Sequence, residues 1–172
     1  MIPTLKTTRL ILKPLQLKFL SDRYLNWMQD PDITKHMESG GKNYSHHMLK
    51  DYLLKIESDR IISWAIILKS DNLHIGNIKI HPIDKKNLVG EYGIMIGDKK
   101  TWGQGFANEA SIAVIKYCFK SLFLKEITLG VKRNNVSAIK LYKNLGFIEN
   151  QKLYNKYNRK DYMRMILTNK KG

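Results

Sequence analysis

The sequence predicts an α/β protein in which helices flank a mixed central sheet. The middle of the chain carries three apolar or alternating segments joined by polar turns, as in an antiparallel meander. The last third alternates helical and strand-like segments, which favours parallel pairing. The length of 172 residues suits one folding unit, so we expect a single domain over residues 1–172.

The first sixty residues predict one strand and two helices. Residues 9–13 form an apolar segment typical of a short strand. Residues 17–28 place apolar side chains on one side at helical spacing, and Pro31 is expected to end this helix. After a polar, glycine-containing loop, residues 48–57 predict a second helix with its own apolar stripe.

The rest of the chain supplies the meander and then the alternating elements. The expected strands cover residues 61–68, 75–81, 90–97, 127–131 and 160–167, and the expected helices cover residues 108–122 and 137–145. The predicted order is therefore β-α-α-β-β-β-α-β-α-β. Along 90–97, the side chains alternate, so one face should carry Tyr92, Ile94 and Ile96 and the other Glu91, Gly93 and Met95.

The net charge of +15 is concentrated late in the chain, because residues 99–172 hold 16 Lys/Arg and only 4 Asp/Glu. Such an excess fits either an anionic ligand or a lysine-rich composition with no functional meaning. The basic residues are scattered, without an arginine-rich arm, a zinc finger or an RNP-like aromatic motif. We therefore expect no nucleic-acid partner.

Other compositional features narrow the class of protein. No secretory signal and no spanning apolar run occurs, so we expect a cytoplasmic protein without a membrane partner. The single cysteine, Cys118, allows no internal disulfide and predicts core packing. Trp27 and Trp64 are expected in the core as well. The histidines His36, His74 and His81 are dispersed in sequence, which argues against a metal site.

The most informative segment joins the strand over 90–97 to the helix over 108–122. It reads Lys-Thr-Trp-Gly-Gln-Gly-Phe-Ala-Asn from Lys100 to Asn108. Two glycines allow a sharp turn and a close approach of the backbone to a ligand, and the helix that follows offers free N–H groups. This pattern predicts a pyrophosphate cradle, with Lys99 and Lys100 adding charge at its mouth; the alternative is an ordinary strand-to-helix turn. It matches neither the dinucleotide fingerprint nor the Walker loop.

Two spaced motifs resemble those of the GNAT superfamily of N-acetyltransferases. The basic-x-x-Gly-x-Gly pattern from Lys100 to Gly105 resembles its acyl-CoA loop, although the family often has Gln or Arg where Lys100 stands. The string over 134–147 (NNVSAIKLYKNLGF) is similar to its second signature. Residues 8–12 (TRLIL) and 102–110 (WGQGFANEA) resemble the branch containing the ribosomal-protein acetyltransferases. The resemblance covers about residues 8–167.

The resemblance implies an acyl-CoA N-acyltransferase fold with acetyl-CoA as co-substrate and no metal. It implies that backbone N–H groups over 102–107 hold the pyrophosphate. The pantetheine arm would pair with backbone groups of Met95 and Ile96, one of which would face the thioester oxygen. Asn135 would bind the pantetheine or cap a helix. The implied cofactor-binding residues are Met95, Ile96, Lys100, Thr101, Trp102, Gly103, Gln104, Gly105, Phe106, Ala107, Asn108 and Asn135.

Two residues are candidates for proton transfer. Tyr142 stands at the tyrosine position of the second signature and would protonate the leaving thiolate; the alternative is a tyrosine that only packs against the sheet. Glu91 lies in an apolar strand and would take the proton of the attacking amine, directly or through water. Its alternatives are a solvated position or an ion pair with one of the many lysines.

The expected activity is acetyl transfer to a primary amine of a small molecule by direct attack in a ternary complex. Similarity to relatives that act on amino sugars, including nucleotide-linked ones, suggests such an acceptor. The alternatives are a protein N-terminus or an aminoglycoside as acceptor, and, outside enzymes, a module that senses acyl-CoA without turnover. The sequence leaves a homodimer open and does not identify the amine.

Overall fold

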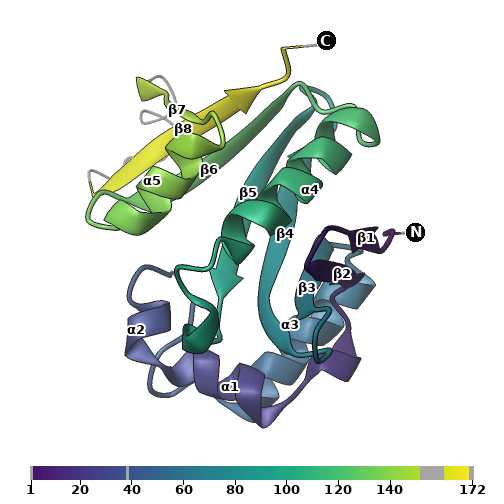
Figure 1. Ribbon diagram of the computed structural model, residues 1–172, viewed down its shortest axis with the longest axis vertical. Helices are drawn as coiled ribbons and strands as arrows, with labels where there is room; N and C mark the ends of the chain where they lie inside the picture. Colours follow the sequence, from purple (N-terminus) through teal and green to yellow (C-terminus); the bar gives the residue numbers. More distant parts are fainter. Residues whose placement is uncertain (1, 38, 152–160, 171–172) are drawn as a thin grey trace.

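The computed structural model describes residues 2–37, 39–151 and 161–170, and Figure 1 shows their arrangement. The strands are β1 (Leu5–Lys6), β2 (Leu10–Pro14), β3 (Ile62–Leu68), β4 (His74–Asp84), β5 (Val89–Ile96), β6 (Glu126–Lys132), β7 (Ile148–Glu149) and β8 (Tyr162–Thr168). The helices are α1 (Asp22–Gln29), α2 (Pro31–Thr34), α3 (His46–Ser58), α4 (Phe106–Lys120) and α5 (Val136–Asn144), with short 3-10 turns at Leu17–Phe19 and Lys99–Thr101.

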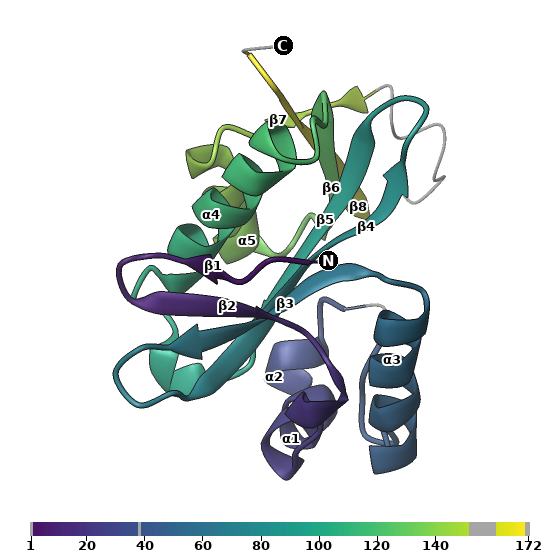
Figure 2. The same cartoon turned by 90° about the vertical axis from the view of Figure 1, so that its right-hand side faces the viewer.

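The eight strands form one mixed sheet in the order β1-β2-β3-β4-β5-β6-β8-β7. All neighbouring strands in the described chain are antiparallel except β5 and β6, which run parallel through the α4 crossover. Helices α4 and α5 cover one face of the sheet, and α1, α2 and α3 gather at the other (Figure 2). The predicted α/β class with a mixed, helix-flanked sheet is therefore confirmed.

The two halves of the sheet separate between β5 and β6. Pairing joins only Val89 with Glu126, Gly90 with Ile127, and Glu91 with Thr128, although β5 continues to Ile96. The β6 strand instead continues beside β8 as far as Lys132. From Tyr92 onward, the β6-facing edge of β5 therefore has no strand beside it in the described chain, and Figure 1 shows the two strands diverging there.

The alternation along β5 sends its side chains to two different hydrophobic clusters. Tyr92, Ile94 and Ile96 belong to the cluster beneath α4, whereas Met95 packs with the cluster beneath α1 and α3. The predicted core positions of Cys118, Trp27 and Trp64 are confirmed, because all three side chains are buried. Burial raises the pKa of the Cys118 thiol to about 12, so this thiol is an inert part of the core.

The segment before Pro31 differs from the single helix that we predicted. Ser21 is extended and its hydroxyl accepts a hydrogen bond from the Tyr24 N–H, so α1 begins only at Asp22. The prediction that Pro31 ends the segment misses a second helix. Pro31 is the first residue of α2, where its missing N–H is tolerated, and Asp30 caps that helix by accepting from the Asp32 N–H.

The remaining differences concern short elements and boundaries. Strands β1 and β7 have two residues each, too few to show a periodic pattern. Helix α4 begins at Phe106 rather than at the predicted 108, because Gly105 adopts a left-handed conformation and starts it. The predicted start of the last strand, Lys160, lies outside the described residues. None of the described helices combines the length and apolar character needed to span a bilayer.

Candidate active site

A tight turn after β5 fixes the start of the glycine loop. The Asp98 carboxylate accepts a hydrogen bond from the Lys100 N–H at 3.0 Å, and its carbonyl accepts from the Thr101 hydroxyl at 2.7 Å. Asp98 also forms an ion pair with Arg23 at 3.1 Å. The Trp102 N–H donates to the Lys99 carbonyl at 3.2 Å. The backbone N–H groups of Lys100 and Trp102 are therefore used inside the turn itself.

The next six backbone N–H groups, from Gly103 to Asn108, have no acceptor in the part of the chain that the structure describes. Gly103 and Gly105 both have positive φ, at 75° and 81°, which turns the loop into the first turn of α4. Gly105 caps α4 without a side chain, so the helix end stays open to a ligand. Such a run of N–H groups at a helix N-terminus is suited to an anion such as a phosphate.

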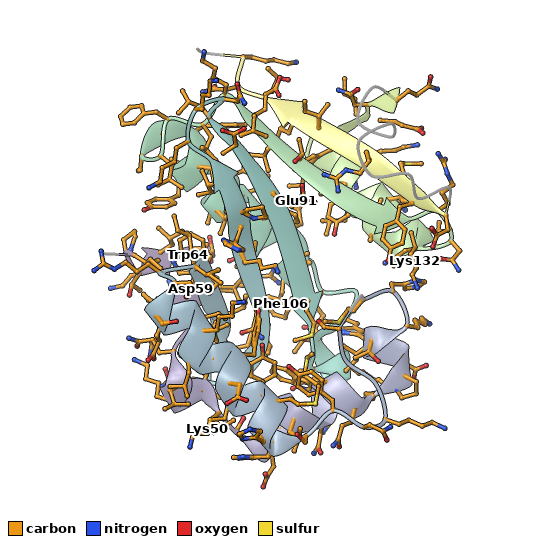
Figure 3. The ribbon with its side chains drawn as sticks, turned by 180° about the vertical axis from the view of Figure 1, so that it is seen from behind. Lys50, Asp59, Trp64, Glu91, Phe106 and Lys132 are labelled. Atoms are coloured by element: carbon orange, nitrogen blue, oxygen red, sulfur yellow. The ribbon has the colours of Figure 1, made fainter. Side chains whose placement is uncertain are left out.

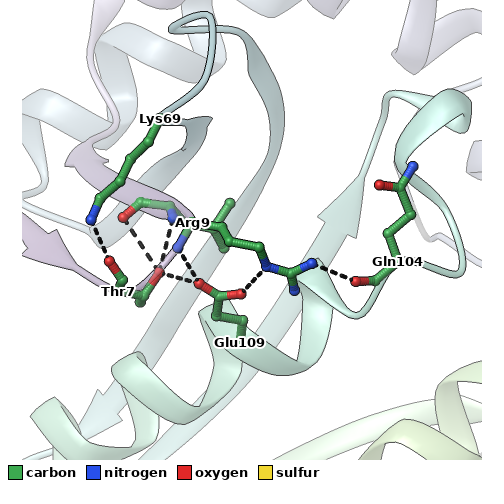
Figure 4. A network of polar contacts seen from close by, with 6 residues as sticks. Thr7, Arg9, Lys69, Gln104 and Glu109 are labelled. Carbon is green, nitrogen blue, oxygen red and sulfur yellow. Dashed lines mark hydrogen bonds and ion pairs between the residues drawn. The ribbon is translucent and has the colours of Figure 1, made fainter.

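A polar network ties this loop to the N-terminal strands, as Figure 4 shows. The Glu109 carboxylate accepts from the Arg9 Nε at 2.7 Å, from the Arg9 backbone N–H at 2.7 Å and from the Thr7 hydroxyl at 2.6 Å. The Arg9 guanidinium also donates to the Gln104 carbonyl at 3.0 Å and lies 4.3 Å from the centroid of the Phe106 ring. Arg9 therefore supports the glycine loop from behind.

The protonation of Glu109 follows from this network. Its partial burial raises the carboxyl pKa, but the hydrogen bonds from Thr7 and Arg9 together outweigh burial and leave the pKa below its ordinary value. The carboxylate is thus ionised at neutral pH, and the ion pair with Arg9 is in place there.

The two lysines at the mouth of the loop differ. Lys99 was expected to add charge there, but its ammonium forms ion pairs with Asp30 and Asp32, both at 2.7 Å, and is directed toward α2. Lys100 forms no side-chain contact of this kind with the described residues and stays exposed. Of the predicted pair, only Lys100 remains a candidate for binding an anion.

The last residues of β5 lie next to the loop. The Trp102 indole N–H donates to the Ile96 carbonyl at 2.9 Å, which closes the loop back onto the strand. The Ile96 carbonyl thus already accepts a hydrogen bond from Trp102. A ligand that lies along this edge of β5 therefore has to hydrogen-bond to other backbone groups of the strand.

Tyr142 projects from α5 into the aromatic cluster beneath α4. Its ring meets the Tyr92 ring edge-on at 5.8 Å between centroids and the Phe147 ring at 6.0 Å. The side chain is 8% exposed, and its hydroxyl has no hydrogen bond to any described residue. Burial raises its pKa to about 12, so the phenol keeps its proton throughout the neutral range.

Asn135 begins α5 as its N-cap. Its side-chain oxygen accepts from the Ala138 N–H at 3.3 Å and from the Ser137 hydroxyl at 3.2 Å. The structure thus confirms the capping role that the sequence offered, while the contact with pantetheine stays a prediction.

Glu91 stands at the last paired position of β5 and β6, where the sheet begins to separate (Figure 3). Its carboxylate accepts from both terminal nitrogens of Arg164, at 2.8 and 2.6 Å, and from the Thr128 hydroxyl at 2.8 Å. Sequence reasoning considered a lysine as partner and missed Arg164. The only available signal was an arginine inside the otherwise apolar strand β8.

A cavity of about 490 Å³ opens on the face of the sheet that α1 and α3 cover. Along β5, Glu91, Gly93 and Met95, which were predicted to share a face, contribute to its floor, and Tyr92 and Ile94 border it as well. Its remaining described lining combines aromatic, polar and charged side chains, which include Tyr24, Tyr44, Tyr52, His36, His81, Ser63, Asn77, Lys79 and Arg164. The cavity therefore brings together two histidines that looked dispersed in the sequence. Within the described residues, no three metal-ligating side chains cluster.

Known proteins with similar sequences and folds fit this geometry. The family model described as "Acetyltransferase (GNAT) domain" matches residues 9–148. An uncharacterized N-acetyltransferase of Bacillus licheniformis, p20, is 33% identical over 150 residues, which are 84% of this chain and 82% of that protein. The chain belongs to the GNAT family of acetyl-CoA-dependent N-acetyltransferases, which confirms the resemblance at the level of the superfamily.

Solved structures support the same fold. A GNAT-family acetyltransferase from Bacillus anthracis superposes with a TM-score of 0.81 at 20% identity, covering 96% of this chain and 98% of that one. A spermidine N-acetyltransferase from Vibrio cholerae, solved in complex with CoA and spermine, gives 0.78 at 23% identity, with 94% and 96% covered. At these identities the likeness is one of fold.

Proposed function

We propose that this chain transfers the acetyl group of acetyl-CoA to a primary amine of a small molecule held in the cavity over β5. One juxtaposition supports this proposal. The unsatisfied N–H groups from Gly103 to Asn108 follow directly on the unpaired edge of β5, and the floor of the cavity is formed by that same strand. A loop suited to an anion and a cavity suited to an acceptor thus meet at one strand.

The described residues fit acetyl-CoA, which supplies an acetyl thioester. The six N–H groups would hold the pyrophosphate, with Lys100 adding charge and Thr101 and Trp102 shaping the turn. The open edge of β5 at Met95 and Ile96 would pair with the amide-containing pantetheine arm as an added strand would. Asn135, at the head of α5, would contribute a polar contact from the opposite side of the gap.

Two side chains would move the protons. As the amine nitrogen forms its bond to the acetyl carbon and the carbon–sulfur bond breaks, the nitrogen loses one proton and the departing sulfur gains one. Glu91 would accept the first, directly or through water, because Arg164 and Thr128 fill three of the roughly four acceptor positions of its carboxylate and leave one. Tyr142, a protonated phenol without a partner in the described chain, would donate the second.

The decisive experiment measures thiol release from acetyl-CoA against a panel of amines, with calorimetry of acetyl-CoA binding in parallel. We expect binding at micromolar strength without added metal, together with release of CoA that depends on the amine. Absence of binding at millimolar acetyl-CoA would reject the proposed function. Binding without amine-dependent release for any acceptor would favour a sensor of acyl-CoA.

Replacing Glu91 with Gln tests its role as a base through the pH–rate profile. The substitution should slow turnover most at low pH, where the acceptor amine is protonated, and higher pH should partly restore the rate because the amine then loses its proton in solution. Chemical denaturation provides the control, since Arg164 loses its charged partner in this variant. An equal loss of rate at every pH, together with lower stability, would show that Glu91 only holds Arg164.

A further inference from the structure

The floor of the cavity carries buried donor groups that the protein itself does not satisfy. Ser63 lies on β3 and Asn77 on β4, with exposed fractions of 1% and 9%. The Ser63 hydroxyl and the Asn77 side-chain nitrogen have no hydrogen-bond partner among the described residues, and both residues line the cavity. Leaving a buried polar group unpaired costs about 1–3 kcal/mol, so such groups at a cavity call for a polar partner, either ordered water or a polar ligand that displaces it.

The orientation of Asn77 is fixed by His74. The His74 Nε2 atom lies 3.0 Å from the Asn77 side-chain oxygen and 3.0 Å from the Gly76 carbonyl oxygen. Both neighbours are acceptors, so this nitrogen carries the hydrogen. Burial is the main reason that the His74 pKa is lowered, which keeps the ring neutral. The Asn77 oxygen is therefore held by His74, and its NH₂ group, buried in a residue that lines the cavity, has no acceptor among the described residues.

Lys79 adds a positive charge to the same face. In the β3–β4 register Ser63 stands opposite Lys79, and Asn77 lies two residues before Lys79, so all three side chains share one face. The Lys79 stem lies over Gly93 of β5, where an added Cβ would come within 3.4 Å of it. Its ammonium has no ion pair or hydrogen bond to any described residue, although Lys79 lines the cavity.

The charges around the cavity do not balance. Glu91 is the only acidic side chain in its described lining, and it is already held by Arg164. Lys79 thus has no ion-pair partner among the described residues, and it lies on the sheet face that also carries the two unsatisfied donors. A second ammonium group, as in a diamine or polyamine, would meet like charge here, whereas an anionic group would be attracted to Lys79 and would accept hydrogen bonds from the donors that it reaches.

We infer that the acceptor amine also carries an anionic group, a carboxylate or a phosphate, that binds to Lys79, Asn77 and Ser63. This inference rests on the proposed function and names its substrate class. Asn77 and Lys79 pair with Met95 and Gly93, so the anion binds one strand spacing, about 5 Å, from the strand beside which the thioester would lie. The amine and the anion therefore belong to one compact molecule, unlike the spermine of the Vibrio cholerae complex.

The test uses amines that differ only in the second group. Glycine, β-alanine, 4-aminobutanoate and 6-aminohexanoate are compared with their amides and with the diamines of equal length, and 2-aminoethyl phosphate supplies a phosphate arm. We expect kcat/KM for the best anionic acceptor to exceed that of its amide and its diamine by about ten- to a hundredfold, the range expected for hydrogen bonds to a charged group. Whether carboxylate or phosphate is preferred identifies the source of the anion.

Substitutions test whether the preference for an anionic acceptor comes from Lys79, Asn77 and Ser63. Lys79→Met should reduce kcat/KM for the anionic acceptor to about the level of its amide, whereas Lys85→Met, which removes the same charge from the exposed β4–β5 turn, should leave the preference intact. Asn77→Asp should shift the preference toward the diamine. A preference for amides or diamines in the unmodified protein, or an anion preference that survives Lys79→Met, would overturn the inference.

If none of these amines is acetylated, their binding to the protein still tests the anion site. Calorimetry on the acetyl-CoA-saturated protein should then detect the carboxylate or phosphate members, with binding lost in Lys79→Met. If they bind without being acetylated, the anion site stands and the proposed function fails. If amines are acetylated without any preference for an anion, the function stands and the inference fails. Absence of binding by every anionic member at tens of millimolar would also overturn it.

Discussion

Replacing Gly105 with Val should weaken acetyl-CoA binding at least about a hundredfold while leaving the protein folded. The residue has a φ of 81°, a conformation that a β-branched side chain adopts only with strain. An added Cβ would meet no protein atom closer than the Arg9 Nη2 at 3.6 Å, so the branch point of the new side chain finds room. The strained backbone would instead change the direction of the N–H groups that the loop and the first turn of α4 present. Calorimetry with acetyl-CoA measures the loss.

A second glycine separates strain within the glycine loop from strain elsewhere in the chain. Gly41 has a φ of 126° and open space where a Cβ would stand, but it lies in the loop before α3, away from the N–H run. Gly41→Val should carry at least as much backbone strain, because a φ of 126° lies further from the left-handed region that other residues adopt, and it should bind acetyl-CoA normally. If Gly105→Val also binds normally, while circular dichroism shows both variants folded, the pyrophosphate is held elsewhere.

The other large effect is expected for Tyr142→Phe, which should lower kcat about ten- to a thousandfold, the usual contribution of a general acid. Acetyl-CoA affinity should change much less, because the ring keeps its contacts with Tyr92 and Phe147. The pKa of about 12 keeps the hydroxyl protonated, so ionisation of Tyr142 should not lower the wild-type rate between about pH 6 and 10. Steady-state kinetics across that range provides the measurement.

Tyr92 offers a matched control from the same aromatic cluster. Its hydroxyl is bonded to the Ser111 hydroxyl at 2.6 Å, whereas that of Tyr142 has no partner in the described chain. Tyr92→Phe should therefore cost about 1 kcal/mol of stability and change kcat little. Tyr142→Phe should show the reverse: little change in stability and a slow turnover. Equal kcat values for the Tyr142→Phe variant and the unmodified protein would leave Tyr142 a structural residue.

The fold was predictable from the sequence wherever an element is long enough to show a repeated spacing of apolar residues. Strands β3 and β5 and helices α3, α4 and α5 each show enough apolar periodicity to be found within one or two residues of their ends. The broken segment around Ser21 was missed, because a side-chain cap interrupted a helical apolar spacing that continues through it. Strands of two residues carry no periodic signal, since their pairing is decided by the neighbouring strand.

The candidate active site was likewise only partly predictable from the sequence. The glycine loop and the tyrosine of the second signature are continuous in sequence, so both could be proposed from the residues alone. The residues that form hydrogen bonds and ion pairs with the site residues come from distant parts of the chain. Arg164 reaches Glu91 from β8, and Arg9 reaches Glu109 from the turn just before β2. Neither of these pairings leaves a spacing that a single sequence can reveal.

The gap between β5 and β6 also bears on how this protein survives in a cell. An unpaired strand edge inside a sheet is an opening at which the chain can pair wrongly or start to unfold. A ligand that fills such an opening binds the native state alone and adds stability, by about 2.7 kcal/mol when its concentration is a hundred times its dissociation constant. The steady-state amount of the enzyme would then follow the supply of its acyl donor, with starvation removing the protein by proteolysis as well as halting its reaction.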